Sequence, residues 1–218
     1  MPDYPRILPV GEAAFTVEFG DAVDETLNRQ VHALDVHLCT SSVPGLVETV
    51  PTYRSLLVTY DPQVSRAEVV RAALTDALAT LAAAADLLAG RLVEIPVHYG
   101  GAWGPDLADV ATHCDMTEQA VIESHAQPIY TVAMLGFAPG FAYLLGLPET
   151  LATPRLATPR LRVPPGSVGI AGAQTGVYAL ETPGGWRIIG RTGLALFDPA
   201  REAPFILHAG DRVRFVPL

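Results

Sequence analysis

The chain has 218 residues, a mass of 23.1 kDa and a formal net charge of −9, and half of its residues are hydrophobic. This length allows one large or two small domains with a sizeable core, and the acidic balance argues against a nucleic-acid binder. The sequence contains no lysine, so all 14 basic residues are arginine, which excludes a P-loop lysine, a Schiff-base lysine and a lysine general base.

The first 90 residues show the order strand, strand, helix, strand, strand, helix. Alternating or continuous apolar runs predict the strands, and apolar residues repeated on one helical face predict the helices. The expected strands are 4–10, 13–19, 46–50 and 55–60, and the expected helices are 23–39 and 66–89. This order is typical of a small domain with helices on one face of an antiparallel sheet.

Residues 91–218 are expected to form a second domain that is rich in short strands. Two short helices are predicted at 106–113 and 117–125. The expected strands are 92–99, 130–135, 167–171, 176–180, 186–190, 194–197 and 212–216. Many short strands separated by glycine and proline turns indicate a barrel or a sandwich. The predicted fold class is therefore α+β, with domains 1–90 and 91–218.

Targeting and metal signals are missing from the sequence. The N-terminus does not show a signal-peptide pattern, and the longest apolar stretch, 77–89, is too short to span a bilayer. Neither the two cysteines nor the six histidines show metal-ligand spacing. We expect a cytoplasmic protein without a bound metal, without a membrane partner and without a nucleic-acid partner.

The segment 130–198 concentrates glycine, proline and arginine. The pentapeptide Leu-Ala-Thr-Pro-Arg occurs twice in succession and ends at Arg155 and Arg160. Residues 150–218 hold eight arginines and four carboxylates, whereas residues 1–149 hold six arginines and 19 carboxylates. A proline before each arginine stiffens the backbone, so both guanidinium groups suit a clamp for a carboxylate or a phosphate. The alternative is that these arginines form salt bridges with the acidic part of the chain or with a partner.

Further residues in this segment are candidates for anion or substrate binding. A glycine-rich loop with exposed N–H groups forms an anion nest; alternatively, the loop at 136–141 lets the barrel close, with its two phenylalanines in the core. Outside this loop, Gln174, Thr175 and Thr192 supply uncharged hydrogen-bond donors, and Arg191 supplies one more guanidinium. The residues expected to bind substrate or anion are Gly136, Phe137, Gly140, Gln174, Thr175, Arg191 and Thr192.

His125 is the candidate proton carrier, because it precedes the strand that leads into this loop. The alternative is a helix C-terminal cap. The expected catalytic residues are His125, Arg155 and Arg160, and the sequence shows no nucleophile paired with a base. The chain is therefore expected to supply only part of a catalytic site.

Several motifs resemble one family. They are GFAPGF at 136–141, VPPGSVGIAGAQTGVY at 163–178, PGGWRIIGRT at 183–192 and GDRVRF at 210–215. The chain resembles the B subunit of bacterial ATP-dependent 5-oxoprolinase, a family also described as allophanate hydrolase subunit 1. It includes a Kip-type kinase inhibitor and a carboxyltransferase module.

The resemblance implies a cyclophilin-like β-barrel and a role in the ATP-dependent conversion of 5-oxo-L-proline to L-glutamate. The implied partners are a larger homologous C subunit together with an A subunit. ATP is then bound by the complex with the C subunit, whereas the isolated chain has little activity. Two alternatives stay open: an inhibitor of a sensor histidine kinase, and a component of a biotin-dependent carboxyltransferase in an allophanate–urea pathway.

Overall fold

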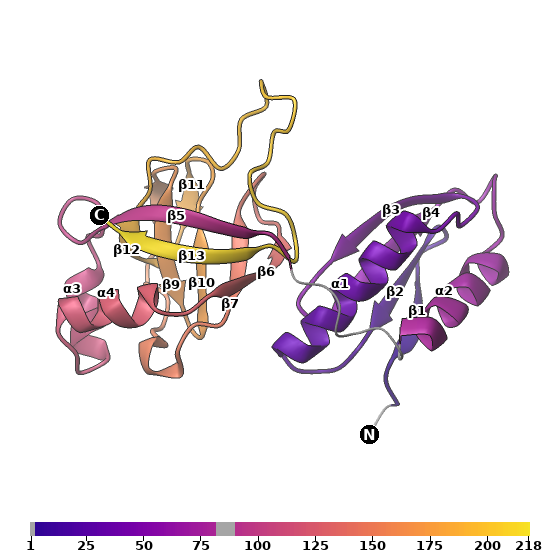
Figure 1. Ribbon diagram of the computed structural model, residues 1–218, viewed down its shortest axis with the longest axis horizontal. Coiled ribbons are helices and arrows are strands. Elements are labelled where there is room, and N and C mark those ends of the chain that lie inside the picture. Colours follow the sequence, from indigo (N-terminus) through magenta and orange to yellow (C-terminus); the bar gives the residue numbers. More distant parts are fainter. Residues whose placement is uncertain (1–2, 82–89) are drawn as a thin grey trace. The chain divides into compact units, whose positions relative to one another are not determined.

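Figure 1 shows the computed structural model of the protein, which describes residues 3–81 and 90–218. The chain divides into two compact units, Met1–Ala89 and Gly90–Leu218. Each unit contains a hydrophobic core of its own.

The first unit is a four-stranded antiparallel sheet with two helices. In spatial order the strands are β1 (Arg6–Val10), β2 (Ala14–Glu18), β4 (Ser55–Tyr60) and β3 (Leu46–Pro51). The helices α1 (Glu25–Thr40) and α2 (Ala67–Leu81) share one core with the sheet. In β4 every second residue is buried, as expected when helices cover one face of a sheet.

Helix α1 begins two residues later than the predicted helix at 23–39. The Asp24 carboxylate accepts hydrogen bonds from the N–H groups of Thr26 (2.8 Å) and Leu27 (3.0 Å), and these bonds satisfy donors that have no partner within the helix. The predicted second helix extended to residue 89; α2 is described as far as Leu81, and residues 82–89 lie outside the described residues.

The second unit is built around a closed barrel. In spatial order its strands are β10 (Gln174–Val177), β7 (Ala142–Leu145), β6 (Tyr130–Leu135), β13 (Arg212–Pro217), β5 (Leu92–Tyr99), β12 (Arg187–Arg191) and β9 (Ser167–Ala171). Pairing of β9 with β10 closes the ring. All neighbouring pairs are antiparallel except β13 and β5, which run parallel.

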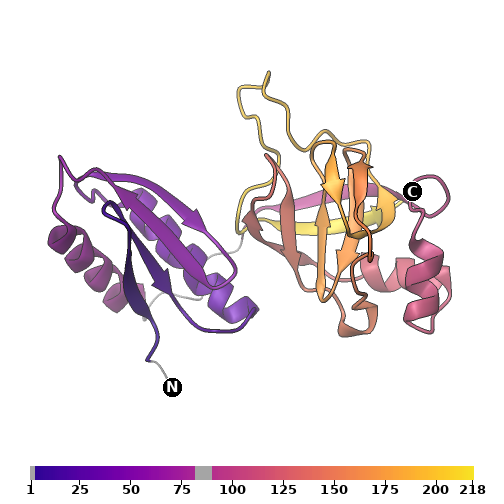
Figure 2. The same cartoon turned by 180° about the vertical axis from the view of Figure 1, so that it is seen from behind.

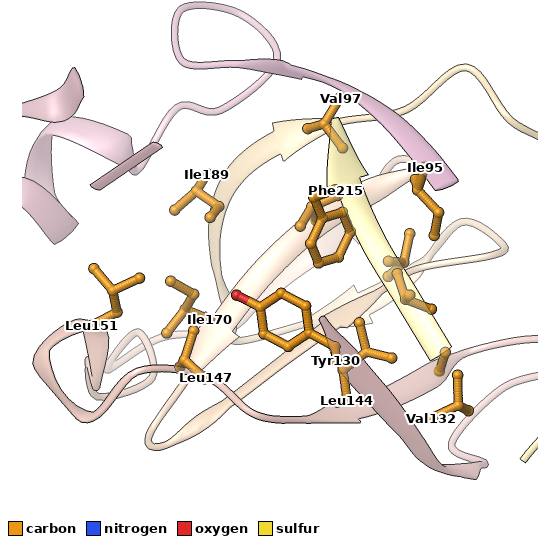
Figure 3. Packing of buried hydrophobic residues seen from close by; sticks show 14 of the residues in the cluster. Ile95, Val97, Tyr130, Val132, Leu144, Leu147, Leu151, Ile170, Ile189 and Phe215 are labelled. Atoms are coloured by element: carbon orange, nitrogen blue, oxygen red, sulfur yellow. The ribbon is translucent and has the colours of Figure 1, made fainter. Parts of the chain in front are cut away.

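The barrel interior is filled by apolar side chains, including Ile95, Leu144 and Phe215 (Figure 3). Helices α3 (Leu107–His113) and α4 (Glu118–Ala126) add Leu107 and Val121 to this core. A 3₁₀ helix, η1 (Glu149–Leu151), follows β7, and a separate two-stranded sheet consists of β8 (Arg160–Val163) and β11 (Thr182–Gly184).

The predicted fold class, a helix-on-sheet unit followed by a β-barrel, is confirmed. The predicted strands at 92–99, 130–135 and 167–171 coincide with β5, β6 and β9. The predicted strand at 194–197 is wrong, because this segment has no strand. Phe197 forms only an isolated bridge with Phe205, and their rings pack with centroids 5.0 Å apart.

Candidate functional site

One side of the barrel wall carries an outer aromatic cluster, which consists of Phe141, Tyr143, Tyr178 and Trp186. The Phe141 ring lies edge-on to the other three, at centroid distances of 4.7, 4.9 and 5.4 Å. Such edge-to-face pairs add about 0.5–1.5 kcal/mol each beyond burial. The rings of Phe141, Tyr178 and Trp186 are buried in this cluster, whereas Tyr143 is partly exposed.

Strand alternation places this cluster outside the barrel. On β9 and β12, residues of the barrel core alternate with residues of the outer cluster. Figure 2 shows the barrel from behind, with these strands in orange. Gly176 faces outward, and a Cβ there would lie 3.1 Å from the Trp186 ring and 3.3 Å from the Phe141 ring. The glycine therefore leaves the space that the two rings occupy.

The loop between β6 and β7 presents Phe137 beside this cluster. Its side chain is 63% exposed, and its ring centroid lies 5.5 Å from that of Phe141. The backbone of Phe137 has a φ of 65°, a left-handed conformation that costs a non-glycine residue on the order of 1–3 kcal/mol. An exposed phenylalanine held in such a conformation is a candidate for ligand binding.

Hydrogen bonds within this loop occupy the backbone N–H groups of Gly136, Ala138 and Phe141, which are therefore not free for the expected anion nest. The N–H of Gly136 donates to the Phe141 carbonyl (3.1 Å), and the N–H of Phe141 donates to the Ala138 carbonyl (3.0 Å). These bonds close the loop on itself. Gly140 has a φ of 75°, and a Cβ there would lie 2.8 Å from the Phe197 Cβ; this glycine therefore serves the packing of the loop.

Arg155 lies in a stretch of chain that is fixed at both ends. Thr153 exchanges two backbone hydrogen bonds with Gly172, at 3.2 and 2.7 Å, and the N–H of Leu156 donates to the Gly185 carbonyl at 2.7 Å. Gly185 precedes Trp186 of the outer aromatic cluster. The Arg155 side chain is exposed, and no carboxylate within residues 3–81 and 90–218 forms an ion pair with it.

Arg160, the second arginine of the repeat, is in a different environment. Its Nη2 atom lies 2.6 Å from Oδ1 of the buried Asp106, and the N–H of Ile188 donates to Oδ2 of the same carboxylate at 2.6 Å. Its Nη1 atom is buried without a hydrogen-bond partner among the described residues. Asp106 thus neutralises Arg160, as the salt-bridge alternative predicts for this residue, and the two arginines of the expected clamp are in different environments.

His125 lies inside the barrel core and is fully buried. Its Nε2 lies 2.9 Å from the Thr175 hydroxyl, which donates its own proton to the Gly169 carbonyl; its Nδ1 lies 2.8 Å from the Tyr99 hydroxyl. The Thr175 oxygen must then accept from Nε2–H, and Nδ1 accepts from Tyr99. Burial lowers the pKa of His125 to about 3, so the ring is neutral. This geometry favours a structural role, because neither ring nitrogen reaches solvent.

The remaining candidate residues lie in separate places. Thr175 belongs to the buried bonds of His125, whereas Gln174 precedes it on β10 and faces outward next to Ala171 of the cluster side. Arg191 is stacked over Trp103, with its Cζ 4.2 Å from the ring centroid. The Thr192 hydroxyl oxygen accepts from the N–H of Leu194 at 3.1 Å. The loop with Phe137 thus packs on the aromatic cluster, and the backbone next to Arg155 is bonded to Gly185, which precedes Trp186 of the cluster. Arg191 and Thr192 take part in other contacts.

Sequence reasoning did not identify Tyr143 and Tyr178 as part of the site. Burial raises the pKa of Tyr178 to about 12, against the lowering effect of Arg155 and Arg160. Burial also raises the pKa of Tyr143, and Arg155 acts against this. Both phenols are therefore protonated at neutral pH, and the charge of Arg155 acts on both.

No group of three or more His, Cys, Asp or Glu side chains in the described ranges is placed to hold a metal ion. Within the same ranges, no helix has the length and apolar character needed to cross a membrane.

Comparison with known proteins gives consistent results. A family model described as carboxyltransferase domain, subdomain C and D, matches residues 5–207. A protein of Escherichia coli, named as the B subunit of 5-oxoprolinase, is 46% identical, with the match covering 97% of this chain and 95% of that protein. A protein of Bacillus subtilis with the same name is 43% identical, with coverages of 97% and 92%.

The crystal structure of TTHA0988 matches the fold with a TM-score of 0.83 and 40% sequence identity. The match covers 94% of this chain but 40% of the solved chain, so this fold also occurs as part of a longer polypeptide. A urea amidolyase of Lachancea kluyveri is 38% identical over 58 residues, which is 24% of this chain and 3% of that protein.

Proposed function

This chain belongs to the 5-oxoprolinase B-subunit family, and we propose that it acts as that subunit in an ATP-dependent enzyme that converts 5-oxo-L-proline to L-glutamate. The observation that carries the proposal is the identity of 43–46% to relatives of this name over 97% of the chain. The family membership itself agrees with the resemblance seen in the sequence motifs.

The chemistry requires more than the described residues of this chain offer. Hydrolysis of an unstrained amide needs activation of its carbonyl, and transfer of a phosphoryl group to the amide oxygen would make the carbon electrophilic. Phosphoryl transfer relies on several cations around the phosphates. The chain has no lysine, and Arg160 and Arg187 are paired with Asp106 and Asp109. We therefore assign ATP binding to the complex with the larger C subunit.

The partners are part of the same proposal. The name of one subunit implies further subunits, and the solved chain of TTHA0988 is more than twice as long as its match to this one. We expect a heteromer with the C and A subunits, located in the cytoplasm, where ATP is available.

Reconstitution tests this function directly. The chain is combined with the A and C subunits from the same source organism, and ATP-dependent release of L-glutamate from 5-oxo-L-proline is measured. We expect turnover by the assembly, little or none by the chain alone, and co-elution with the C subunit in size-exclusion chromatography. A verified assembly without turnover would contradict the function, and robust turnover by the single chain would contradict the need for partners.

The same preparations address the two alternatives. The family model and the short match to urea amidolyase favour a carboxyltransferase role as the second candidate. Carboxyl transfer from carboxybiotin by the assembly, without 5-oxoproline turnover, would establish it. Inhibition of histidine-kinase autophosphorylation by the chain alone would instead support the inhibitor function.

A further inference from the structure

We propose that Arg155, Phe137 and Tyr143 form the binding site for a small cyclic monocarboxylate, with the carboxylate on Arg155 and the ring of the ligand against the two aromatic side chains. The inference rests on the proposed function for the identity of the ligand, which is then 5-oxo-L-proline. It assigns a residue-level site on the outer wall of the barrel.

The position of Arg155 is the first support. The nearby residues Thr153 and Leu156 form backbone hydrogen bonds with Gly172 and Gly185. The backbone that carries the Arg155 side chain is therefore fixed on both sides. The carbonyl of Pro154 also accepts from Arg187 Nε at 3.4 Å. A preorganised arginine loses less entropy when it binds an anion.

The charge balance around the site selects a monoanion. Three other arginines between residues 155 and 190 are offset by carboxylates: Arg160 by Asp106, Arg187 by Asp109 and Arg162 by Glu181. Of these four arginines, only Arg155 has no such partner among the described residues. One guanidinium matches one carboxylate through two parallel hydrogen bonds, whereas a triphosphate would keep most of its charge uncompensated.

The aromatic side chains supply a surface for an uncharged ring. Phe137 is exposed, Tyr143 is half-buried, and both pack edge-on against the buried Phe141, at centroid distances of 5.5 and 4.7 Å. A Cβ on Gly136 would lie 3.9 Å from Cε2 of Tyr143, so the strained loop lies directly beside Tyr143. The Tyr143 ring packs against Trp186, with ring centroids 5.8 Å apart. Trp186 follows Gly185, whose carbonyl accepts from the N–H of Leu156 next to Arg155. These contacts connect the aromatic side chains to the backbone at Arg155.

Calorimetric titration of the full chain tests the site. The probes are 5-oxo-L-proline and 2-pyrrolidinone, which has the same ring without the carboxylate. We expect the wild-type chain to bind the acid more tightly by about 10- to 150-fold, the usual worth of a charge-assisted pair. Arg155→Ala should bind the acid more weakly than the wild type by this factor and should bind 2-pyrrolidinone with unchanged affinity. Phe137→Ala should weaken the binding of both probes. Arg162→Ala, an exposed arginine outside the site, should bind both probes like the wild type.

Three results would overturn the site: no binding of the acid at millimolar concentration, equal binding by Arg155→Ala and wild type, or ATP binding that depends on Arg155. The outcome separates this inference from the proposed function. If the reconstituted complex turns over 5-oxo-L-proline equally well with Arg155→Ala, the site is wrong and the function remains. If Arg155-dependent binding occurs but a verified complex shows no turnover, the function is wrong and the site remains.

Discussion

His125 shows how burial decides the behaviour of a single residue. The imidazole is enclosed by the rings of Phe215 and Tyr130, with centroids at 4.6 and 5.5 Å, and both of its nitrogens are hydrogen bonded. Its place before β6 was visible in the sequence. Its burial was not, because its partners Tyr99 and Thr175 are 26 and 50 residues away along the chain.

The lowered pKa of His125 predicts a pH dependence of stability. The unfolded chain binds a proton at this histidine below its ordinary pKa of 6.5, whereas the folded chain does so only near pH 3. Above about pH 6.5 the ring is neutral in both states, and the full stability of the fold is present. As the pH is lowered from 6.5 to 3, only the unfolded chain gains the proton, so the free energy of unfolding falls by up to about 1.4 kcal/mol for each pH unit.

The variant His125→Gln should reduce this slope in thermal unfolding between pH 7 and 4.5, and should lower Tm at pH 7 because ring packing is lost. His113→Gln, which changes an exposed histidine, is the control and should keep the wild-type profile. We expect kcat of the assembled enzyme to change by no more than a few-fold. A loss of about 10²–10⁴-fold at unchanged Tm would instead establish His125 as a general acid or base.

At the scale of elements, the two copies of the repeated pentapeptide have different roles. The first ends at Arg155, which forms no ion pair with the residues that the structure describes, and the second leads into β8 with Arg160 paired to Asp106. Asp106 also accepts from the N–H of Ile188 on β12. The carboxylate thus joins the start of α3 to two strands.

The variant Asp106→Ala should lower the free energy of unfolding by about 1.5–3 kcal/mol, because a buried, charge-assisted pair is lost. The matched control is Asp109→Ala, whose carboxylate is exposed where it pairs with Arg187; surface pairs contribute about 0–1 kcal/mol. Chemical denaturation monitored by circular dichroism measures both. Equal losses in the two variants would show that Asp106 has no special role in joining these elements.

The elements differ in how well the sequence predicts them. β5, β6 and β9 contain runs of apolar residues and were predicted at their correct bounds. β7, β8 and β11 have three or four residues each and lie among glycines and prolines, where local periodicity is too short to detect. Strand β10 begins two residues before its predicted start at 176, because pairing with β7 and β9 sets its register.

The same limit applies to the candidate site. The motif at 136–141 and the first of the repeated arginines lie in the part of the chain from which the proposed site is built. The pairing of Arg160 could not be predicted, because Asp106 is 54 residues away. Tyr143 and Tyr178 gave no local signal, since only the pairing of β7 with β10 and the outward alternation bring them to one surface.

At the scale of the whole molecule, the second unit contains a closed barrel with its own core. We expect a fragment of residues 90–218 to fold alone and to unfold cooperatively. Dispersed amide signals in NMR and a single thermal transition would support this. A fragment that aggregates or lacks signal dispersion would show that the barrel depends on the preceding residues.

The place of β13 in the barrel has a consequence for synthesis on the ribosome. This strand, residues 212–217, inserts between β5 and β6 and is the last of the barrel strands to be translated. The first unit is assembled from residues close in sequence and can form while translation continues. The barrel cannot close before β13 is translated, so until then β5 and β6 each have one edge without a partner strand. During that interval, exposed strand edges are open to pairing with other nascent chains, so this unit is where a chaperone would protect the growing protein.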